Sequence, residues 1–218
     1  MAAGRLGRVM RPLLDREVYE CLTLDWPGGQ EAGASPSDSD VQIRAVDRTQ
    51  LARLSADPGC GIKQKFLRGI ERTPDLCFGA FAGEALVSYV FFAPASPIAI
   101  DARLQFEFPA DWIYVYKAFT RPAWRGKRLL HQVLAHGMGC LGPHRFVTLV
   151  VAGNQASRKA FERCGFRPTQ RFPVWRVLSW PWPLTVRDSR GFSVMIRSDH
   201  AARPAHRAGY SPPSAEHR

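Results

Sequence analysis

The sequence predicts a mixed α/β (α+β) domain in which helices cover both faces of a central sheet. The predicted elements follow one another as a strand, two helices, a hairpin, a long strand, a helix, a strand, a helix and terminal strands. Two β-rich runs, residues 76–81 and 86–92, are joined by a short turn around Gly83, which indicates the hairpin. Residues 145–151 form a nearly continuous apolar run, which is typical of a strand covered on both faces.

Apolar periodicity predicts the elements on either side of this hairpin. Residues 41–46 alternate like a half-buried strand, and Asp47 or Thr49 can cap the short helix that follows. A second helix is predicted over residues 62–70, where apolar side chains recur at intervals of three and four. After the hairpin, residues 112–120 are the strongest predicted strand, because aromatic and β-branched side chains fill nearly every position.

The last third of the chain contains two further helices and the terminal strands. The first helix is predicted over residues 126–140, and the second runs into Gly165, which can end it in a left-handed conformation. Additional strands are expected over residues 172–178 and 192–196.

The organised domain is predicted to span residues 41–198. Residues 1–40 are predicted to be an N-terminal extension and linker, since a possible strand at 18–25 is followed by a stretch rich in Gly, Ser, Pro and Asp. Residues 199–218 have few apolar side chains to bury and are expected to be a disordered tail.

Composition limits the kind of partner and the compartment. The formal net charge of +11, from 30 basic and 19 acidic residues, predicts an anionic partner without choosing between a polyphosphate, nucleic acid and an anionic surface. The five cysteines form no C-x-x-C pair, and no histidine lies at metal-ligand spacing, so neither a metal site nor a disulfide framework is predicted. No long apolar segment follows the basic start, so we expect a cytoplasmic protein without a membrane partner.

A phosphate site is predicted at the start of the helix after the strongest strand. Three basic residues in the run 125–128 come directly before the apolar positions of that helix. Backbone N–H groups at a helix N-terminus lack intrahelical partners and carry a partial positive charge, so cations placed there complete an anion receptor.

Two segments of the chain resemble the GCN5-related N-acetyltransferase (GNAT) superfamily. The first is Thr120-x-Pro122-x-Trp124-Arg125-Gly126-Lys127, which is similar to the strand end and acyl-CoA pyrophosphate loop of that family. The second is Asn154-x-x-Ser157-x-x-x-Phe161-x-x-x-Gly165-Phe166, which is similar to its second signature. The resemblance covers residues 41–178 and implies a mixed, mostly antiparallel central sheet and acetyl-CoA or another acyl-CoA as cofactor.

The resemblance implies cofactor contacts for three groups of residues. Backbone groups at the strand end would pair with the pantetheine arm and polarise the acetyl carbonyl: Ala118, Phe119 and Thr120. Backbone amides of the loop would hold the pyrophosphate: Arg125, Gly126, Lys127, Arg128, Leu129 and Leu130. The other side of the cofactor would be lined by Asn154, Ser157 and Arg158.

The chain departs from the family pattern at two places. Arg128 and Leu130 stand where the family loop usually has small residues, which changes how closely the backbone can approach a phosphate. Phe161 stands where many members have a tyrosine that protonates the leaving thiolate. Coenzyme A thiolate is a fair leaving group unaided, so transfer does not require that acid.

The incoming amine also needs a base, acting directly or through water. In relatives an acidic residue often lies near the position of Tyr114, whereas this chain has Tyr114 and Tyr116 on one face of the strand and Glu107 upstream. These three are the candidate catalytic residues. The alternatives are core packing for the tyrosines and a solvated carboxylate for Glu107.

The expected function is transfer of an acetyl or other acyl group from acyl-CoA to a small-molecule or peptide amine, by direct attack in a ternary complex of a monomer or homodimer. The alternative is a non-catalytic module that keeps the fold to bind acyl-CoA or another protein. Nucleic-acid binding is disfavoured, because the basic residues concentrate at the expected phosphate site and in the tails rather than in a stripe with exposed aromatics.

Overall fold

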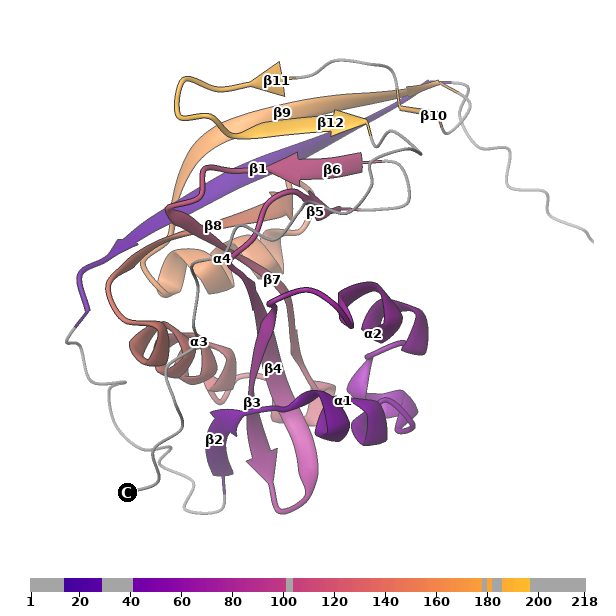
Figure 1. Cartoon of the computed structure of the whole chain (residues 1–218), viewed down its shortest axis with the longest axis vertical. Helices are drawn as coiled ribbons and strands as arrows, with labels where there is room; N and C mark the ends of the chain where they lie inside the picture. Colours follow the sequence, from indigo (N-terminus) through magenta and orange to yellow (C-terminus); the bar gives the residue numbers. More distant parts are fainter. Residues whose placement is uncertain (1–13, 29–40, 101–103, 178–179, 182–185, 197–218) are drawn as a thin grey trace, which may run out of the picture.

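Two sheets form the framework of the protein (Figure 1). The computed structural model describes residues 14–28, 41–100, 104–177, 180–181 and 186–196. The large sheet has eight strands in the order β10-β9-β1-β8-β7-β4-β3-β2, and the small sheet has four in the order β11-β12-β6-β5. Among the described strand pairs only β7 and β8 run parallel, so the predicted mixed, mostly antiparallel α+β fold is confirmed.

The bounds of the elements agree with most of the segments predicted from the sequence. The strands of the large sheet are β1 (Leu14–Trp26), β2 (Val41–Ala45), β3 (Leu76–Ala82), β4 (Ala85–Ala93), β7 (Trp112–Thr120), β8 (His144–Val151), β9 (Arg167–Val177) and β10 (Trp180–Pro181). The strands of the small sheet are β5 (Ile98–Ala99), β6 (Leu104–Glu107), β11 (Val186–Arg187) and β12 (Ser193–Ile196). The helices are α1 (Arg48–Leu54), α2 (Gln64–Ile70), α3 (Leu129–Leu141) and α4 (Gln155–Arg163).

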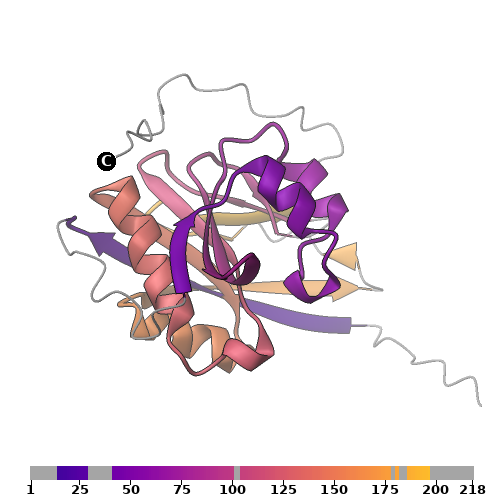
Figure 2. The ribbon, with the colours of Figure 1, turned by 90° about the horizontal axis from the view of Figure 1, so that it is seen from below.

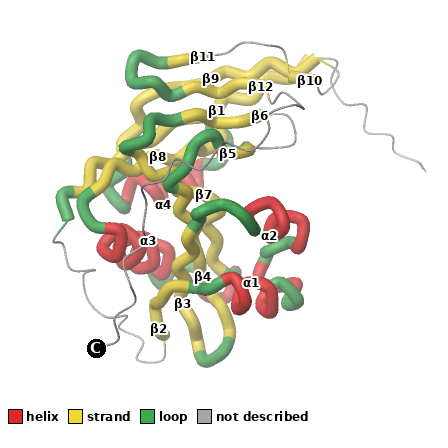
Figure 3. Tube along the Cα trace, in the orientation of Figure 1, coloured by secondary structure: helices red, strands yellow, loops and turns green. Residues whose placement is uncertain are grey.

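Helices cover both faces of the large sheet. Helices α3 and α4 lie on one face, and α1 and α2 lie on the other, as two perpendicular views show (Figures 1 and 2). The strands between them form a continuous layer (Figure 3). The small sheet packs beside β1 and β9, where Phe106 and Phe192 stack against each other and meet buried Phe172 and Val174 of β9. No helix in the described ranges is long and apolar enough to cross a membrane.

Strand β1 corrects the expectation that the first forty residues are peripheral. It lies between β8 and β9 and pairs with both: Glu20 is opposite Val150 on one side and Arg171 on the other. Its apolar residues Cys21 and Leu22 are fully buried, on opposite faces of the sheet. The linker signal after residue 27 therefore follows a strand of the large sheet, and β2 lies at the far edge of the same sheet. The predicted boundaries at residues 41 and 198 stay predictions, and the expected tail lies outside the described residues.

Helix α3 begins three residues later than the sequence predicts. Arg128 has a φ of 57°, in the left-handed region, and is the N-cap of a helix that starts at Leu129. A left-handed residue cannot continue a right-handed helix, so the predicted start at Gly126 is wrong. Residues 126–128 belong instead to the loop that precedes the helix.

Gly137 lets α3 pack closely on the sheet, and we expect Gly137→Ala to destabilise the protein. A Cβ at Gly137 would lie 2.6 and 2.8 Å from ring atoms of Phe92, which is fully buried. Overpacking of this kind costs about 1–3 kcal/mol, more than the ~1 kcal/mol that alanine contributes to helix propensity. Gly139→Ala is the matched control, since no atom lies within 4 Å of its added Cβ. Urea unfolding should therefore show a loss for Gly137→Ala and a gain for Gly139→Ala, and a gain for both would contradict this account.

Candidate functional site

Strands β7 and β8 separate at their carboxyl ends. Their parallel pairing covers Trp112 with Arg145, Ile113 with Phe146 and Tyr114 with Val147. Beyond Tyr114, β7 continues to Thr120 paired with β4 alone, and β8 continues to Val151 paired with β1 alone. The facing edges of the two strands therefore present backbone groups without ladder partners among the described pairs, which a ligand with amide groups can satisfy.

A bulge in β7 lies next to this separation. Tyr89 of β4 is opposite Phe119 and Phe91 is opposite Tyr116, so one residue of β4 faces two of β7, Lys117 and Ala118. Lys117 adopts a left-handed φ of 50°. This conformation costs a non-glycine residue about 1–2 kcal/mol. The bulge turns the backbone at Ala118 away from the regular ladder and changes the direction of its N–H and C=O groups.

Ser88 fixes the end of β7. Its fully buried hydroxyl lies 3.0 Å from the carbonyl oxygen of Phe119 and 2.8 Å from the hydroxyl of Thr120. The strand end that the sequence assigns to the cofactor, Ala118 to Thr120, is therefore held on its β4 side by a hydrogen-bonded neighbour. Its other edge faces the separation from β8.

The loop between β7 and α3 is the candidate anion receptor, and two of its residues have a left-handed backbone. Gly126 has a φ of 84° and Arg128 a φ of 57°, and no side chain caps the N-terminus of α3. Arg128 thus adopts a backbone conformation that usually favours glycine, and position 128 reaches it without glycine. The side chain of Leu129 is buried, which leaves its backbone N–H as its contribution to the loop. Three basic residues directly precede this uncapped helix end in the sequence, which favours binding of an anion.

The predicted residues at the start of α4 already have protein partners. Asn154 is the N-cap of α4, and its side-chain oxygen accepts a hydrogen bond of 3.1 Å from the N–H of Ser157. Arg158 lies 2.8 Å from Glu162 and 3.3 Å from the buried carboxylate of Glu20. Their contacts with a cofactor stay predictions, and the Arg158 side chain also holds α4 to β1.

Phe161 is a core residue of α4. It is 4% exposed and packs edge to face on Phe166, with 5.2 Å between ring centroids. Cys164 follows one turn later, and burial raises the pKa of its thiol to about 12. Neither side chain supplies an acid at neutral pH in the way that the family tyrosine does.

Tyr114 and Tyr116 lie on the face opposite α3 and α4. Their rings stack with a centroid separation of 5.6 Å, and Tyr116 also packs against Phe66 and Phe91. Tyr114 is buried between Phe106 and Phe108, and its hydroxyl is within hydrogen-bond reach of the N–H of Leu149, beyond the last β7–β8 pair. Burial raises the pKa of Tyr114, so its hydroxyl is neutral at the base of the separation.

Tyr116 donates a hydrogen bond to Asp75, a residue that the sequence analysis missed. Asp75 is partly buried between α2 and β3, and burial raises the pKa of its carboxyl above the ordinary value. Burial and the neighbouring Asp75 raise the pKa of Tyr116. The pair joins a hydroxyl on the bulged strand to a carboxylate with raised proton affinity, an arrangement suited to accepting a proton.

Glu107 lies apart from the tyrosines. It alternates along β6 with Phe106, whose ring contacts Tyr114, so its side chain projects from the opposite face of the small sheet. Ser193 of β12 lies opposite it, with its hydroxyl 3.5 Å from the Glu107 carboxylate. The structure therefore brings Tyr114 and Tyr116 together but not Glu107, whose catalytic role stays a prediction.

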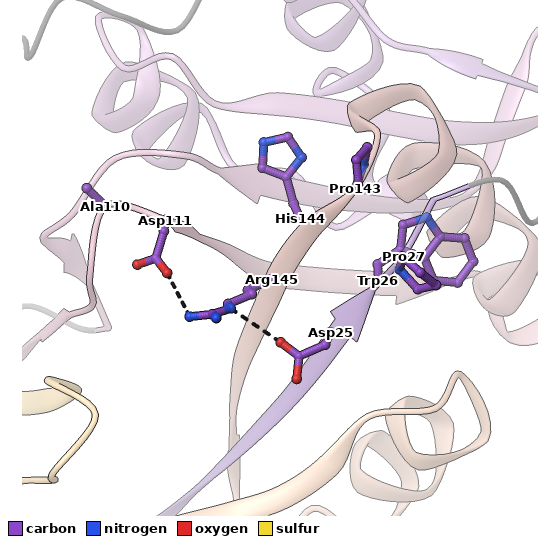
Figure 4. A pocket seen from close by; sticks show the side chains of 8 residues that line it. All are labelled: Asp25, Trp26, Pro27, Ala110, Asp111, Pro143, His144 and Arg145. Carbon is purple, nitrogen blue, oxygen red and sulfur yellow. Dashed lines mark hydrogen bonds and ion pairs between the residues drawn. The ribbon is translucent and has the colours of Figure 1, made fainter.

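A surface hollow of about 780 Å³ lies at the opposite ends of the same strands (Figure 4). Arg145 at its centre pairs with Asp111 at 2.9 Å and with Asp25 at 3.5 Å. All three side chains are more than half exposed, so these ion pairs are weak. The hollow is at the start of β8, whereas the bulge and the anion receptor are at the end of β7.

Comparisons with known proteins identify the family and the fold. The family described as acetyltransferase (GNAT) matches residues 46–166, more than half of the chain. A GCN5-related N-acetyltransferase from Kribbella flavida superposes with a TM-score of 0.50 at 12% identity, over 74% of this chain and 58% of that one. A GCN5-related N-acetyltransferase-like protein from Streptococcus suis also gives 0.50, at 14% identity, over 75% of this chain and 62% of that one.

These two likenesses show a shared fold and no more. The chain spans less than two thirds of the length of either structure, as these shares show. No curated protein matches the chain.

Proposed function

Because this chain belongs to the acetyltransferase (GNAT) family, we propose that it transfers an acetyl or other acyl group from acyl-CoA to an amine. The observation that carries the proposal is the separation of β7 from β8 beyond Tyr114 and Val147, next to a bulge and an uncapped helix N-terminus. The separated strand edges offer backbone N–H and C=O groups to an extended arm that contains amides. The N-terminus of α3 offers a partial positive charge to a pyrophosphate.

The residues present fit acyl-CoA as the cofactor, which would supply an activated thioester. The unpaired edge of β7 from Ala118 to Thr120 would hydrogen-bond the arm and orient the carbonyl. The first-turn N–H groups of α3, with the charges of Arg125 and Arg128, would hold the diphosphate.

Tyr116 and Asp75 would remove the proton from the amine. In this step the amine proton passes to the Tyr116 oxygen while the Tyr116 proton passes to the Asp75 carboxylate, so Asp75 ends protonated and Tyr116 stays neutral. The raised pKa of Asp75 favours this transfer. Phe161 cannot return a proton to the departing thiolate, which would leave unaided or take a proton from water.

Binding and turnover separate this function from the non-catalytic alternative. We expect calorimetry to show acetyl-CoA binding by the wild-type protein, and mass spectrometry to show acylated product from an amine panel. Binding without product from any amine would favour a module that only binds acyl-CoA. Absence of binding would reject both.

Arg125→Ala and Arg128→Ala test where the diphosphate binds. Each should lower the affinity for acetyl-CoA about fivefold to tenfold, because each removes a charge-assisted contact at the loop. Arg53→Ala is the control, since Arg53 is an exposed arginine of α1. If neither loop variant differs from this control, the diphosphate does not bind at α3.

A further inference from the structure

The ammonium group of Lys117 lies against the ring of Phe66, beside the proposed proton acceptor. Lys117, in the bulge of β7, is half-buried and places its ammonium nitrogen 4.7 Å from the Phe66 ring centroid. Lys63 is the exposed N-cap of α2, three residues before Phe66. Tyr116 lies on another side of the same ring, with 6.1 Å between centroids.

Among the described residues, Lys117 lacks an acidic partner of the kind that two other partly buried cations of the protein have. Arg121 pairs with Asp57, and Arg158 pairs with Glu20 and Glu162. Within the described ranges no carboxylate lies within ion-pair distance of Lys63 or Lys117. Burial and the charge of Lys63 both lower the pKa of Lys117, which shows that the two positive charges repel each other.

The backbone supports a functional reason for the position of Lys117. Its left-handed φ of 50° is unfavourable for lysine, and a glycine would relieve it. The bulge directs this lysine onto the face that carries Tyr116 and Asp75, away from α3 and its anion receptor. Strained residues of this kind are concentrated at functional sites.

We propose that the acceptor amine carries an anionic group, such as a carboxylate, and that Lys117 and Lys63 bind that group. This inference rests on the proposed acyltransferase function. An anion here would neutralise the two repelling ammonium groups, and Phe66 would pack against the carbon chain that joins it to the amine. The amine would then lie near Tyr116 and the Asp75 carboxylate. The anionic group of the acceptor would lie near the positive charges of the lysines.

Matched amines test the proposal. Each pair consists of an amino acid and its carboxamide, which differ in charge and hardly in size. We expect the wild-type protein to have at least tenfold higher kcat/KM for the acid, measured by thiol release. Lys117→Met should reduce this preference about tenfold and Lys63→Met by a smaller factor, whereas Lys117→Arg should retain most of it. Lys65→Met is the control, because Lys65 is exposed on the same helix.

The possible outcomes distinguish three cases: a wrong acceptor inference, lysines that bind the cofactor, and a wrong proposed function. Equal kcat/KM for acids and amides, or an unchanged preference in folded Lys117→Met, overturns the inference and leaves the acyltransferase function standing. If Lys117→Met instead weakens binding of coenzyme A but not of its 3′-dephospho form, the lysines bind the cofactor phosphate and the inference is wrong. Acetyl-CoA binding without acylation of any amine rejects the proposed function and this inference with it.

Discussion

Asp75→Asn is expected to lower kcat about a hundredfold while acetyl-CoA affinity stays within twofold, since loss of a general base typically costs a factor of a hundred or more. Asparagine keeps the size of the side chain and can still accept the hydrogen bond from Tyr116, but it cannot take up a proton. The anion receptor at α3 lies on the other side of the sheet, so cofactor binding should be independent of the change. Stopped-flow or steady-state assays of thiol release measure the first quantity, and calorimetry measures the second.

The pH dependence gives this prediction a second readout. Because burial raises the pKa of Asp75, the acid limb of the wild-type kcat/KM profile should lie above the pKa of an ordinary aspartate. Activity should increase as pH rises through that limb, since the ionised carboxylate accepts the proton. Asp75→Asn should remove the limb from the residual activity. An unchanged limb in the variant would assign it to another group.

Stability should change in the opposite direction to activity. A carboxyl whose pKa is raised in the folded state favours folding below its unfolded pKa, and this contribution is lost as pH rises through the folded pKa. Asparagine resembles the neutral form, so Asp75→Asn should have a higher Tm than the wild type near neutral pH, and the difference should shrink in acid. A functional carboxylate that costs stability is the trade-off expected at an active site.

Two further variants test the hydrogen bond itself. Tyr116→Phe removes the hydroxyl that links Asp75 to the bulged strand, so it should reduce kcat as much as Asp75→Asn does. Combining the two changes should cost no more than either alone, because both interrupt one proton route. Asp111→Asn is the matched control, since its exposed carboxylate pairs with Arg145 at the far end of β7. Wild-type kcat in folded Asp75→Asn and Tyr116→Phe would reject this route.

Local sequence signals predicted the strand that leads to the candidate site but not Asp75. Strand β7 has the bounds that its aromatic and β-branched run indicates. The phosphate site at the start of α3 stays a prediction. Asp75 could not be found in this way, because its neighbour Tyr116 is two strands away. The register that joins them runs from Cys77 to Phe91 and from Phe91 to Tyr116, and it exists only after β3, β4 and β7 have paired.

The position of β1 was missed for a related physical reason. A strand between two others has no local signal that distinguishes it from an edge strand, and the Gly-rich and Ser-rich stretch after it indicated a linker. Glu20 in the middle of β1 is buried together with cationic partners, since charged side chains are rarely buried without a partner. Its partners, Arg158 and Arg171, come from α4 and β9, far along the chain.

Arg158→Ala is therefore expected to lower the Tm of the protein, because it leaves the buried Glu20 carboxylate with a single cation. Glu20 is 2% exposed, and one of its oxygens has no hydrogen-bond partner in the described structure, so it depends on Arg158 at 3.3 Å. Arg171 at 2.7 Å remains and keeps the cost below that of an isolated charge. Arg145→Ala, which breaks only exposed ion pairs, should cost less than about 0.5 kcal/mol.

Removing both charges distinguishes the structural role of Arg158 from its predicted contact with the cofactor. Glu20→Met combined with Arg158→Met should recover most of the lost stability, since apolar replacement of a buried ion pair is often neutral or stabilising. Failure to recover would mean that packing, rather than the unpaired Glu20, causes the loss. In the recovered protein β1 and α4 remain in place, so a decrease in acetyl-CoA affinity there can be attributed to the missing guanidinium itself. Unchanged affinity would mean that Arg158 does not bind the cofactor and that its role is to hold α4 to β1.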